Sequence, residues 1–304
     1  QGGQMADAKD GRSGGGRYVA TESSLKLAQM IAERMGIPFD KARTAALSDN
    51  LYETMYGELL DLLDLRDLGP RFESGAYSSA RLFLSQTGEQ EPIIVLDMVF
   101  DFWVEAATHL TSIATFRAMP IAEARKLTDT FEKLFDLFLS ASRFHELRTE
   151  MAPYYLDFTD ELRVSAVLAR AMIVFALCHE IAHALLGHQE EEASPAQELA
   201  ADGEAVRLYL EVCGQQERAR QTHVYLDPKI AGGPLVFMSI LSLLEDWMLA
   251  RGGVRQLPST HPRASERLSQ IHGLLWPNLN ETAQSLVSAH GAALGDIRTL
   301  MDMG

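Results

Sequence analysis

The residues best placed to do chemistry are His179, Glu180 and His183, in the string His-Glu-Ile-Ala-His. Histidines four residues apart project from one face of an α-helix about one turn apart, so both imidazoles can reach a single metal ion. A carboxylate beside them can take a proton from water that the ion polarises. The spacing therefore predicts a zinc hydrolase site, with His179 and His183 as ligands and Glu180 as the general base.

A catalytic zinc site needs a third protein ligand and an open fourth position. Glu198 is the natural candidate, because it lies one turn into a helix predicted to begin at Pro195, after a loop short enough for that helix to fold back. Asp202 lies one further turn along the same face, where it can accept the second N–H of a ligand histidine and fix its tautomer. Three competing carboxylates come too soon after the helix end: Glu190, Glu191 and Glu192.

Other interpretations of this stretch stay open. The two histidines could cap or pair locally on a helix without holding a metal. Cys178 could be a fourth ligand that silences an enzyme, although adjacent helix residues point about 100° apart and a buried apolar cysteine is more common. We interpret His188, which follows Gly187, as a helix-end residue and not as a ligand.

Three motifs in a fixed order resemble a known family. They are His179-Glu-Ile-Ala-His183, Glu198-Leu-Ala-Ala-Asp202 and the segment 259–267, Ser-Thr-His-Pro-Arg-Ala-Ser-Glu-Arg. They resemble gluzincin metallopeptidases of the group that includes the CAAX prenyl endopeptidase and the heat-shock protease HtpX. The resemblance implies that His261 stabilises the developing oxyanion and that Arg267 orients Glu198, Asp202 or the substrate. From the residues alone, His261 and Arg267 are also compatible with a plain capping arrangement at a helix start.

A β-hairpin is predicted where segments 80–85 and 93–97 flank the turn-rich segment 86–92. It resembles the small sheet of the same family, in which an edge strand binds substrate backbone by strand addition. The chain departs from the family pattern in three respects: the usual Asn-Ala-Phe and Pro-Gly-Gly residues are absent, the spanning helices are absent, and a helical insertion occupies about 120–160. The resemblance covers about 75–275 and is strongest at 171–205 and 259–267.

The elements that position these residues are predicted to be mostly helical (mostly α, of the α+β class), with a small sheet flanking the active-site cleft. Apolar periodicity predicts helices at about 21–36, 38–68, 98–116, 121–140, 160–186, 195–212, 234–250, 262–275 and 281–301. Residues 1–20 are Gly-rich and polar and predict a disordered N-terminal tail. We expect residues 21–304 to form a single zincin-type peptidase domain.

Composition narrows the functional classes. The chain has 42 Asp plus Glu against 27 Lys plus Arg and a net charge of −15, which argues against nucleic acid as a partner. Two cysteines and no recognisable secretory signal predict a reducing, cytoplasmic location. Of two long apolar runs, 164–186 contains Arg170 and the His-Glu string, and 234–244 stops at Glu245 and Asp246. Both predict buried helices, not integral membrane spans.

The sequence therefore predicts a soluble metalloendopeptidase with Zn2+ as cofactor and a peptide or protein as substrate. Its general base, Glu180, would assist the attack of zinc-polarised water on the peptide bond. The alternative is a catalytically silent zinc-binding protein with a regulatory or peptide-binding role. A third option is a latent peptidase that is covered by a self-inhibiting segment or awaits a regulatory partner.

Overall fold

The computed structural model describes residues 22–75, 82–85, 92–139, 144–188, 194–251 and 262–302. The predicted tail at 1–20 lies outside these ranges. The described chain begins with two helices, α1 (Glu22–Arg34) and α2 (Lys41–Leu62), and Asp40 caps α2 by accepting a hydrogen bond from the backbone N–H of Arg43. Helix α2 ends six residues before its predicted end, because Asp64, with φ 52°, turns the chain out of the helical conformation.

A three-stranded sheet follows, made of β1 (Arg71–Gly75), β2 (Leu82–Ser85) and β3 (Ile93–Asp97) in the order β1-β3-β2. Strands β2 and β3 are antiparallel, which confirms the predicted hairpin, whereas β1 pairs with β3 in parallel. The central strand β3 is an apolar run whose last four residues are buried. Strand β1 was not predicted, because only Phe72 of its five residues is a strongly apolar residue.

Helices make up most of the rest of the described chain, so the predicted mostly α fold with a small sheet is confirmed. They are α3 (Met98–Phe116), α4 (Ile121–Leu139), α5 (Phe144–Asp157), α6 (Thr159–Leu185), α7 (Pro195–Gly214), α8 (Gln216–Ala219), α9 (Gly233–Ala250), α10 (Ala264–Leu275), a 3-10 turn (Trp276–Asn278) and α11 (Glu281–Asp302). The range 120–160, where a helical insertion is expected, contains α4 and α5; that it is an insertion stays a prediction.

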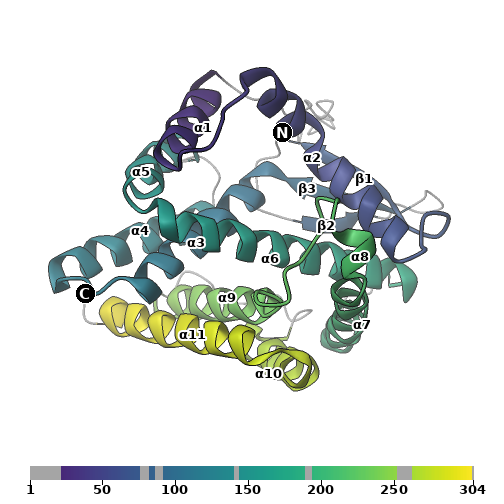
Figure 1. Ribbon diagram of the computed structural model, residues 1–304. Helices are drawn as coiled ribbons and strands as arrows, with labels where there is room; N and C mark the ends of the chain where they lie inside the picture. Colours follow the sequence, from purple (N-terminus) through teal and green to yellow (C-terminus); the bar gives the residue numbers. More distant parts are fainter. Residues whose placement is uncertain are drawn as a thin grey trace, which may run out of the picture.

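Helix α6 runs through the middle of the molecule, with α9, α10 and α11 on one side and α1 and α2 on the other (Figure 1). Its residues from Ala171 to His179 are all buried. Helix α9 approaches it closely at Gly233, where a Cβ atom would lie 2.6 Å from Ala171 Cβ. The helix that carries the His-Glu string is therefore held rigidly in the hydrophobic core.

Two described helices, α6 and α9, are long and apolar enough to cross a membrane, judged by length and composition. The core helix of a globular protein passes the same test, and 72% of the most apolar part of α6 and 61% of that of α9 are buried inside the fold. This is weak evidence for membrane spans. The absence of an integral span stays a prediction.

Candidate metal centre

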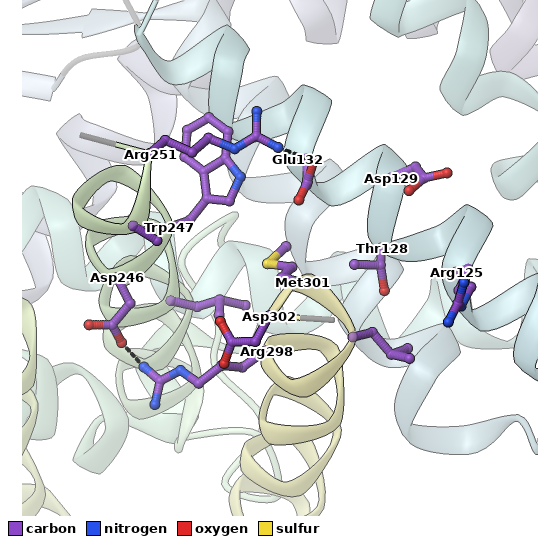
Figure 2. A pocket seen from close by; sticks show the side chains of 13 residues that line it. Arg125, Thr128, Asp129, Glu132, Asp246, Trp247, Arg251, Arg298, Met301 and Asp302 are labelled. Atoms are coloured by element: carbon purple, nitrogen blue, oxygen red, sulfur yellow. Dashed lines mark hydrogen bonds and ion pairs between the residues drawn. The ribbon is translucent and has the colours of Figure 1, made fainter. Parts of the chain in front are cut away.

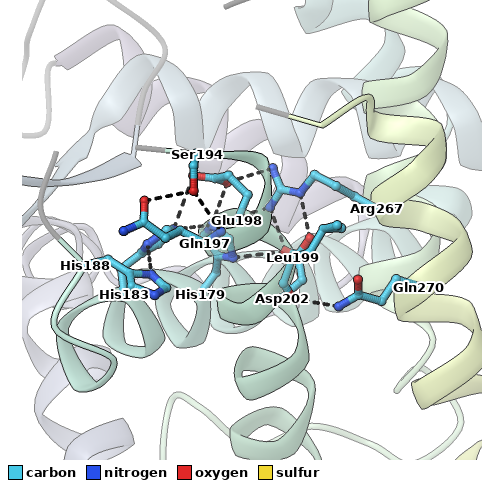
Figure 3. A network of polar contacts seen from close by, with 10 residues as sticks. All are labelled: His179, His183, His188, Ser194, Gln197, Glu198, Leu199, Asp202, Arg267 and Gln270. Carbon is cyan, nitrogen blue, oxygen red and sulfur yellow. Dashed lines mark hydrogen bonds and ion pairs between the residues drawn. The ribbon is translucent and has the colours of Figure 1, made fainter. Parts of the chain in front are cut away.

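The candidate centre lies where the end of α6 meets the start of α7. Helix α6 carries His179, Glu180 and His183, and α7 carries Glu198 and Asp202. Ser194 caps α7 by accepting a hydrogen bond from the backbone N–H of Gln197, and Pro195 occupies the favoured first position of the helix. Glu198 therefore falls in the first turn of α7 and faces the histidines, as Figure 3 shows.

Three potential ligand atoms converge at this point. His179 Nε2 and His183 Nε2 lie 3.1 Å apart, and the two oxygens of Glu198 lie 3.5 Å from His179 Nε2 and 3.4 Å from His183 Nε2. Tetrahedral zinc with bonds of about 2.1 Å places its ligand atoms about 3.4 Å apart. These separations and the donor set therefore fit a zinc ion, and His179, His183 and Glu198 form a group that could hold one.

Asp202 joins the cluster to a third helix. Its side chain is fully buried, and both of its oxygens accept hydrogen bonds from Arg267 of α10, each at 2.7 Å. Asp202 Oδ1 also lies 3.0 Å from His179 Nδ1, at hydrogen-bond distance although the two groups are not aligned as a hydrogen bond. Arg267 Nη1 lies 3.5 Å from Glu198. The arginine thus contacts both acidic residues.

The carboxylates create a strongly negative field at the imidazoles. Burial alone would lower the pKa of His179, but the carboxylates of Asp202 and Glu198 beside the ring outweigh it and raise that pKa to about 9. Burial would raise the pKa of Glu198, yet the two histidines hold it well below its usual range. A positive charge between these groups is therefore strongly favoured, and a divalent cation satisfies the same field.

His188 was interpreted as a helix-end residue only, and that interpretation missed a contact. It does follow the helix end, where the backbone N–H of His188 bonds the carbonyl of His183 at 3.0 Å and that of Gly187 bonds the carbonyl of Ala184 at 3.1 Å. This is a Schellman motif with Gly187, φ 68°, in the left-handed position. It also brings His188 Nδ1 within 3.0 Å of His183 Nδ1. A glycine just after the helix could have signalled this contact.

The other predicted residues are placed as follows. Glu180 is half-buried on α6, and its charge contributes to raising the pKa of Arg267, which indicates that the two side chains lie in one region. Cys178 is fully buried and is not part of the cluster of potential ligands in the described chain. His261 and the competing carboxylates at 190–192 lie outside the described residues.

A cluster of two histidines and a glutamate, in which only His183 is half-buried and the others are buried, fits a metallopeptidase in a mostly helical fold. The family model of Peptidase U49 matches residues 93–286, well over half of the chain, and the protein belongs to this family. The matched segment runs from β3 into α11 and contains the whole cluster, together with Arg267. Searches among curated proteins and among solved structures found no match.

Proposed function

We propose that the protein is a zinc-dependent endopeptidase of the gluzincin type, which hydrolyses peptide bonds in a peptide or protein substrate. The observation that carries the proposal is the set of separations of 3.1, 3.4 and 3.5 Å among the ligand atoms of His179, His183 and Glu198. Glu180 follows His179 directly on the same helix. The resemblance to the CAAX prenyl endopeptidase group rests on the three sequence motifs, and membership of a peptidase family supports the same class of reaction.

The donor set favours zinc over other common ions. Mg2+ and Ca2+ prefer oxygen donors throughout, whereas two imidazoles and one carboxylate are typical of catalytic zinc. Zinc held by these residues would act as a Lewis acid on the scissile carbonyl and would make water a stronger nucleophile at neutral pH. The ligand side chains are only 7–14% exposed, so the protein keeps competing solvent away from the charges.

Glu180 is the group that moves the proton. Its carboxylate would accept a proton from the attacking water and pass it to the leaving amine, the role of a general base and then a general acid. A metal site with a purely structural role needs no such group. The presence of Glu180 therefore favours the peptidase over the silent zinc-binding alternative.

A chain of contacts runs from Arg267 through Asp202 to His179 and orients the ring of this metal-binding histidine. Arg267 holds both oxygens of Asp202, and Asp202 faces Nδ1 of His179, which leaves Nε2 directed at the cluster. Such outer partners fix the ring and its tautomer. We also propose that His261 stabilises the developing oxyanion, as the family resemblance implies. This residue lies outside the described part of the chain.

The substrate is proposed to bind as an extended peptide. Strand β2 lies at an edge of the sheet and contacts α6, so a peptide added to β2 would run close to the helix that carries Glu180. The acidic chain, with its net charge of −15, suits a peptide better than a nucleic acid. We further propose a soluble protein in the cytoplasm.

Metal analysis and peptide cleavage test the proposal together. The wild-type protein should carry near-stoichiometric zinc and cleave a mixed peptide library, and a chelator should stop cleavage. Glu180→Gln should keep zinc and lose cleavage by at least about a hundredfold, the usual contribution of a general base. Glu146→Gln is the matched control, because it alters the only other His-Glu pair, which has Thr149 where a second histidine would stand.

Each other outcome decides between the alternatives. Full activity of Glu180→Gln would remove the assignment of the base, and absence of zinc after reconstitution would remove the metal site. Stoichiometric zinc with no cleavage by the wild type would favour the silent regulatory protein. Cleavage that appears only after limited proteolysis would favour a latent peptidase with a self-inhibiting segment.

A further inference from the structure

Helix α10 brings Arg267 to the metal centre, so the position of this side chain depends on where the helix begins. Arg263 is the N-cap residue of α10, and its side chain makes no capping hydrogen bond. The backbone N–H of Arg267 bonds the carbonyl of Arg263 at 3.0 Å and closes the first turn of the helix. A shift of the helix start would therefore carry Arg267 with it.

A carboxylate from another helix caps this start. Glu245 of α9 accepts a hydrogen bond of 2.9 Å from the backbone N–H of Ala264, the first residue of α10. The first N–H groups of a helix have no partner within the helix, and the helix dipole favours a negative charge beside them. Ala264 is buried, so a lost acceptor at this point is not simply replaced by solvent. Glu245 thus fixes the start of α10 to α9.

The surroundings of Glu245 strengthen this contact. The residue is half-buried, and burial raises the pKa of its carboxyl group. The N–H of Ala264 and the charges of Arg263 and Arg267 act in the opposite direction. Because burial excludes part of the water that would compete for the carboxylate, the hydrogen bond to the helix start counts for more than it would on an open surface.

The neighbouring acid on α9 has a different partner. Asp246 pairs with Arg298 of α11 at the wall of a cavity of about 820 Å3 between α4, α9 and the end of α11, as Figure 2 shows. Adjacent helix residues point about 100° apart, so the two acids face different neighbours. Asp246 joins α9 to α11, whereas Glu245 joins α9 to the helix that carries Arg267.

A second contact fixes α10 beyond Arg267. The amide of Gln270 donates a hydrogen bond of 2.6 Å to the backbone carbonyl of Leu199, which directly follows Glu198 on α7 (Figure 3). Arg267 lies three residues from Gln270 and three from Ala264, so all three positions lie near one face of α10. The arginine is therefore held between an anchor on α9 and an anchor on α7.

We propose that Glu245 is a positioning residue for the metal centre. Its hydrogen bond to the N–H of Ala264 sets the start of α10 and thereby the reach of Arg267 toward Asp202. Asp202 in turn faces the ring of His179. The proposal rests on the proposed function where it concerns zinc, whereas the link from Glu245 to Asp202 holds with or without the ion.

Competition with a chromophoric chelator gives the first test, on zinc affinity. Glu245→Ala removes the acceptor and should lower the affinity at least about threefold, less than direct loss of an orienting carboxylate. Glu245→Gln keeps an oxygen that can accept from Ala264, so its affinity should stay within about twofold of that of the wild type. Two controls should leave the affinity unchanged: Asp246→Ala removes the adjacent acid, and Asp40→Ala removes the cap of α2.

A double-mutant cycle gives the second test and needs no zinc. Urea unfolding of the metal-free protein measures Asp202→Asn alone and combined with Glu245→Ala. If Glu245 positions Arg267, the effect of Asp202→Asn on the unfolding equilibrium constant should be at least about threefold smaller in the Glu245→Ala background than in the wild type. The same cycle with Asp40→Ala should be additive within about twofold, as expected for sites that share no partner.

The outcomes separate this proposal from the proposed function. Additive effects of Glu245→Ala and Asp202→Asn would overturn the proposal, as would wild-type zinc affinity in Glu245→Ala. An equal loss of affinity in Glu245→Gln would also overturn it, because the hydrogen bond would then not set the helix. Glu245→Met keeps the length of the side chain and serves both tests if Glu245→Ala does not fold. A wild type without zinc would remove the proposed function, and the double-mutant cycle would still decide the role of Glu245.

Discussion

The contact between Asp202 and Arg267 can be tested by Asp202→Asn, which keeps the shape of the side chain and removes its charge. The variant leaves the guanidinium of Arg267, whose side chain is 16% exposed, without its principal anion. Breaking a buried ion pair costs about 3–5 kcal/mol. Glu198 still lies 3.5 Å from Arg267 and the amide oxygen can still accept one hydrogen bond, so we expect about 2–3 kcal/mol of lost stability. That corresponds to a fall in Tm of roughly 4–6 °C.

The same substitution should weaken zinc binding. Removing a carboxylate that orients a ligand histidine typically lowers metal affinity by about 10–100-fold, which is about 1.4–2.7 kcal/mol. Competition with a chromophoric chelator measures the affinity, and thermal unfolding of the metal-free protein measures the stability separately. The two readouts distinguish a loosened ligand from a loosened fold.

Glu204→Gln provides the matched control on the same helix. Its partner Arg207 is 57% exposed, and a surface pair of this kind is worth less than about 1 kcal/mol. The control should therefore bind zinc like the wild type and unfold within about 2 °C of it. If Asp202→Asn behaves like Glu204→Gln in both assays, the link from Arg267 through Asp202 to His179 does not hold the centre.

Three further predictions concern other parts of the chain. His188→Ala should lower the affinity for zinc roughly tenfold, because it removes the contact that holds Nδ1 of His183. The control His272→Ala, on α10, should leave the affinity unchanged. Equal affinities of the two variants would show that His188 does not support the centre. Gly233→Ala should cost about 1–3 kcal/mol in urea unfolding, because its Cβ would lie 2.6 Å from Ala171 Cβ, while Gly295→Ala, with no atom within 4 Å, should be neutral or stabilising. Burial lowers the pKa of His109 to about 4 from 6.5, so the unfolded chain binds more protons between these values. The contribution of His109 to the free energy of unfolding, which is fully present above pH 6.5, should therefore fall by about 3 kcal/mol as the pH drops to about 4. Urea unfolding at several pH values measures this, and a His109→Asn variant with the same pH dependence as the wild type would contradict it.

Helical periodicity predicted the long helices well, because each carries a long amphipathic or apolar stretch. Helix α3 has the predicted bounds, and α7 and α9 differ from prediction by two residues or fewer. Helix α5 (Phe144–Asp157) was only implied within the helical insertion, because Pro153 inside it normally signals a break. Packing of α5 against neighbouring helices therefore outweighs the tendency of Pro153 to break a helix.

Strand β1 (Arg71–Gly75) shows the limit of pattern arguments. Its partner β3 lies beyond β2 in the chain, and a parallel pairing leaves no turn signature between the two strands. The hairpin of β2 and β3 was predictable because a turn-rich segment joins two short apolar runs.

For the centre, spacing alone was enough to propose His179, His183 and Glu198, because ligands on adjacent helices obey simple rules of helical geometry. The contact of Arg267 with Asp202 joins positions 65 residues apart, so only the resemblance to a family suggested it. The contact of His188 with His183 was open to prediction, since a glycine after a helix end commonly marks a Schellman turn.

The distance in sequence between Asp202 and Arg267 also bears on when the protein becomes active. Helices α6 and α7 are neighbours in the chain and can pair early, whereas α10 must cross a gap of 65 residues to bring Arg267 to Asp202. A half-made chain would thus hold the two histidines and Glu198 together before the group that fixes Asp202 arrives. We expect zinc captured at that stage to be bound loosely. In the proposed mechanism, the segment that follows α7 would then delay full activity until α10 has packed against α7.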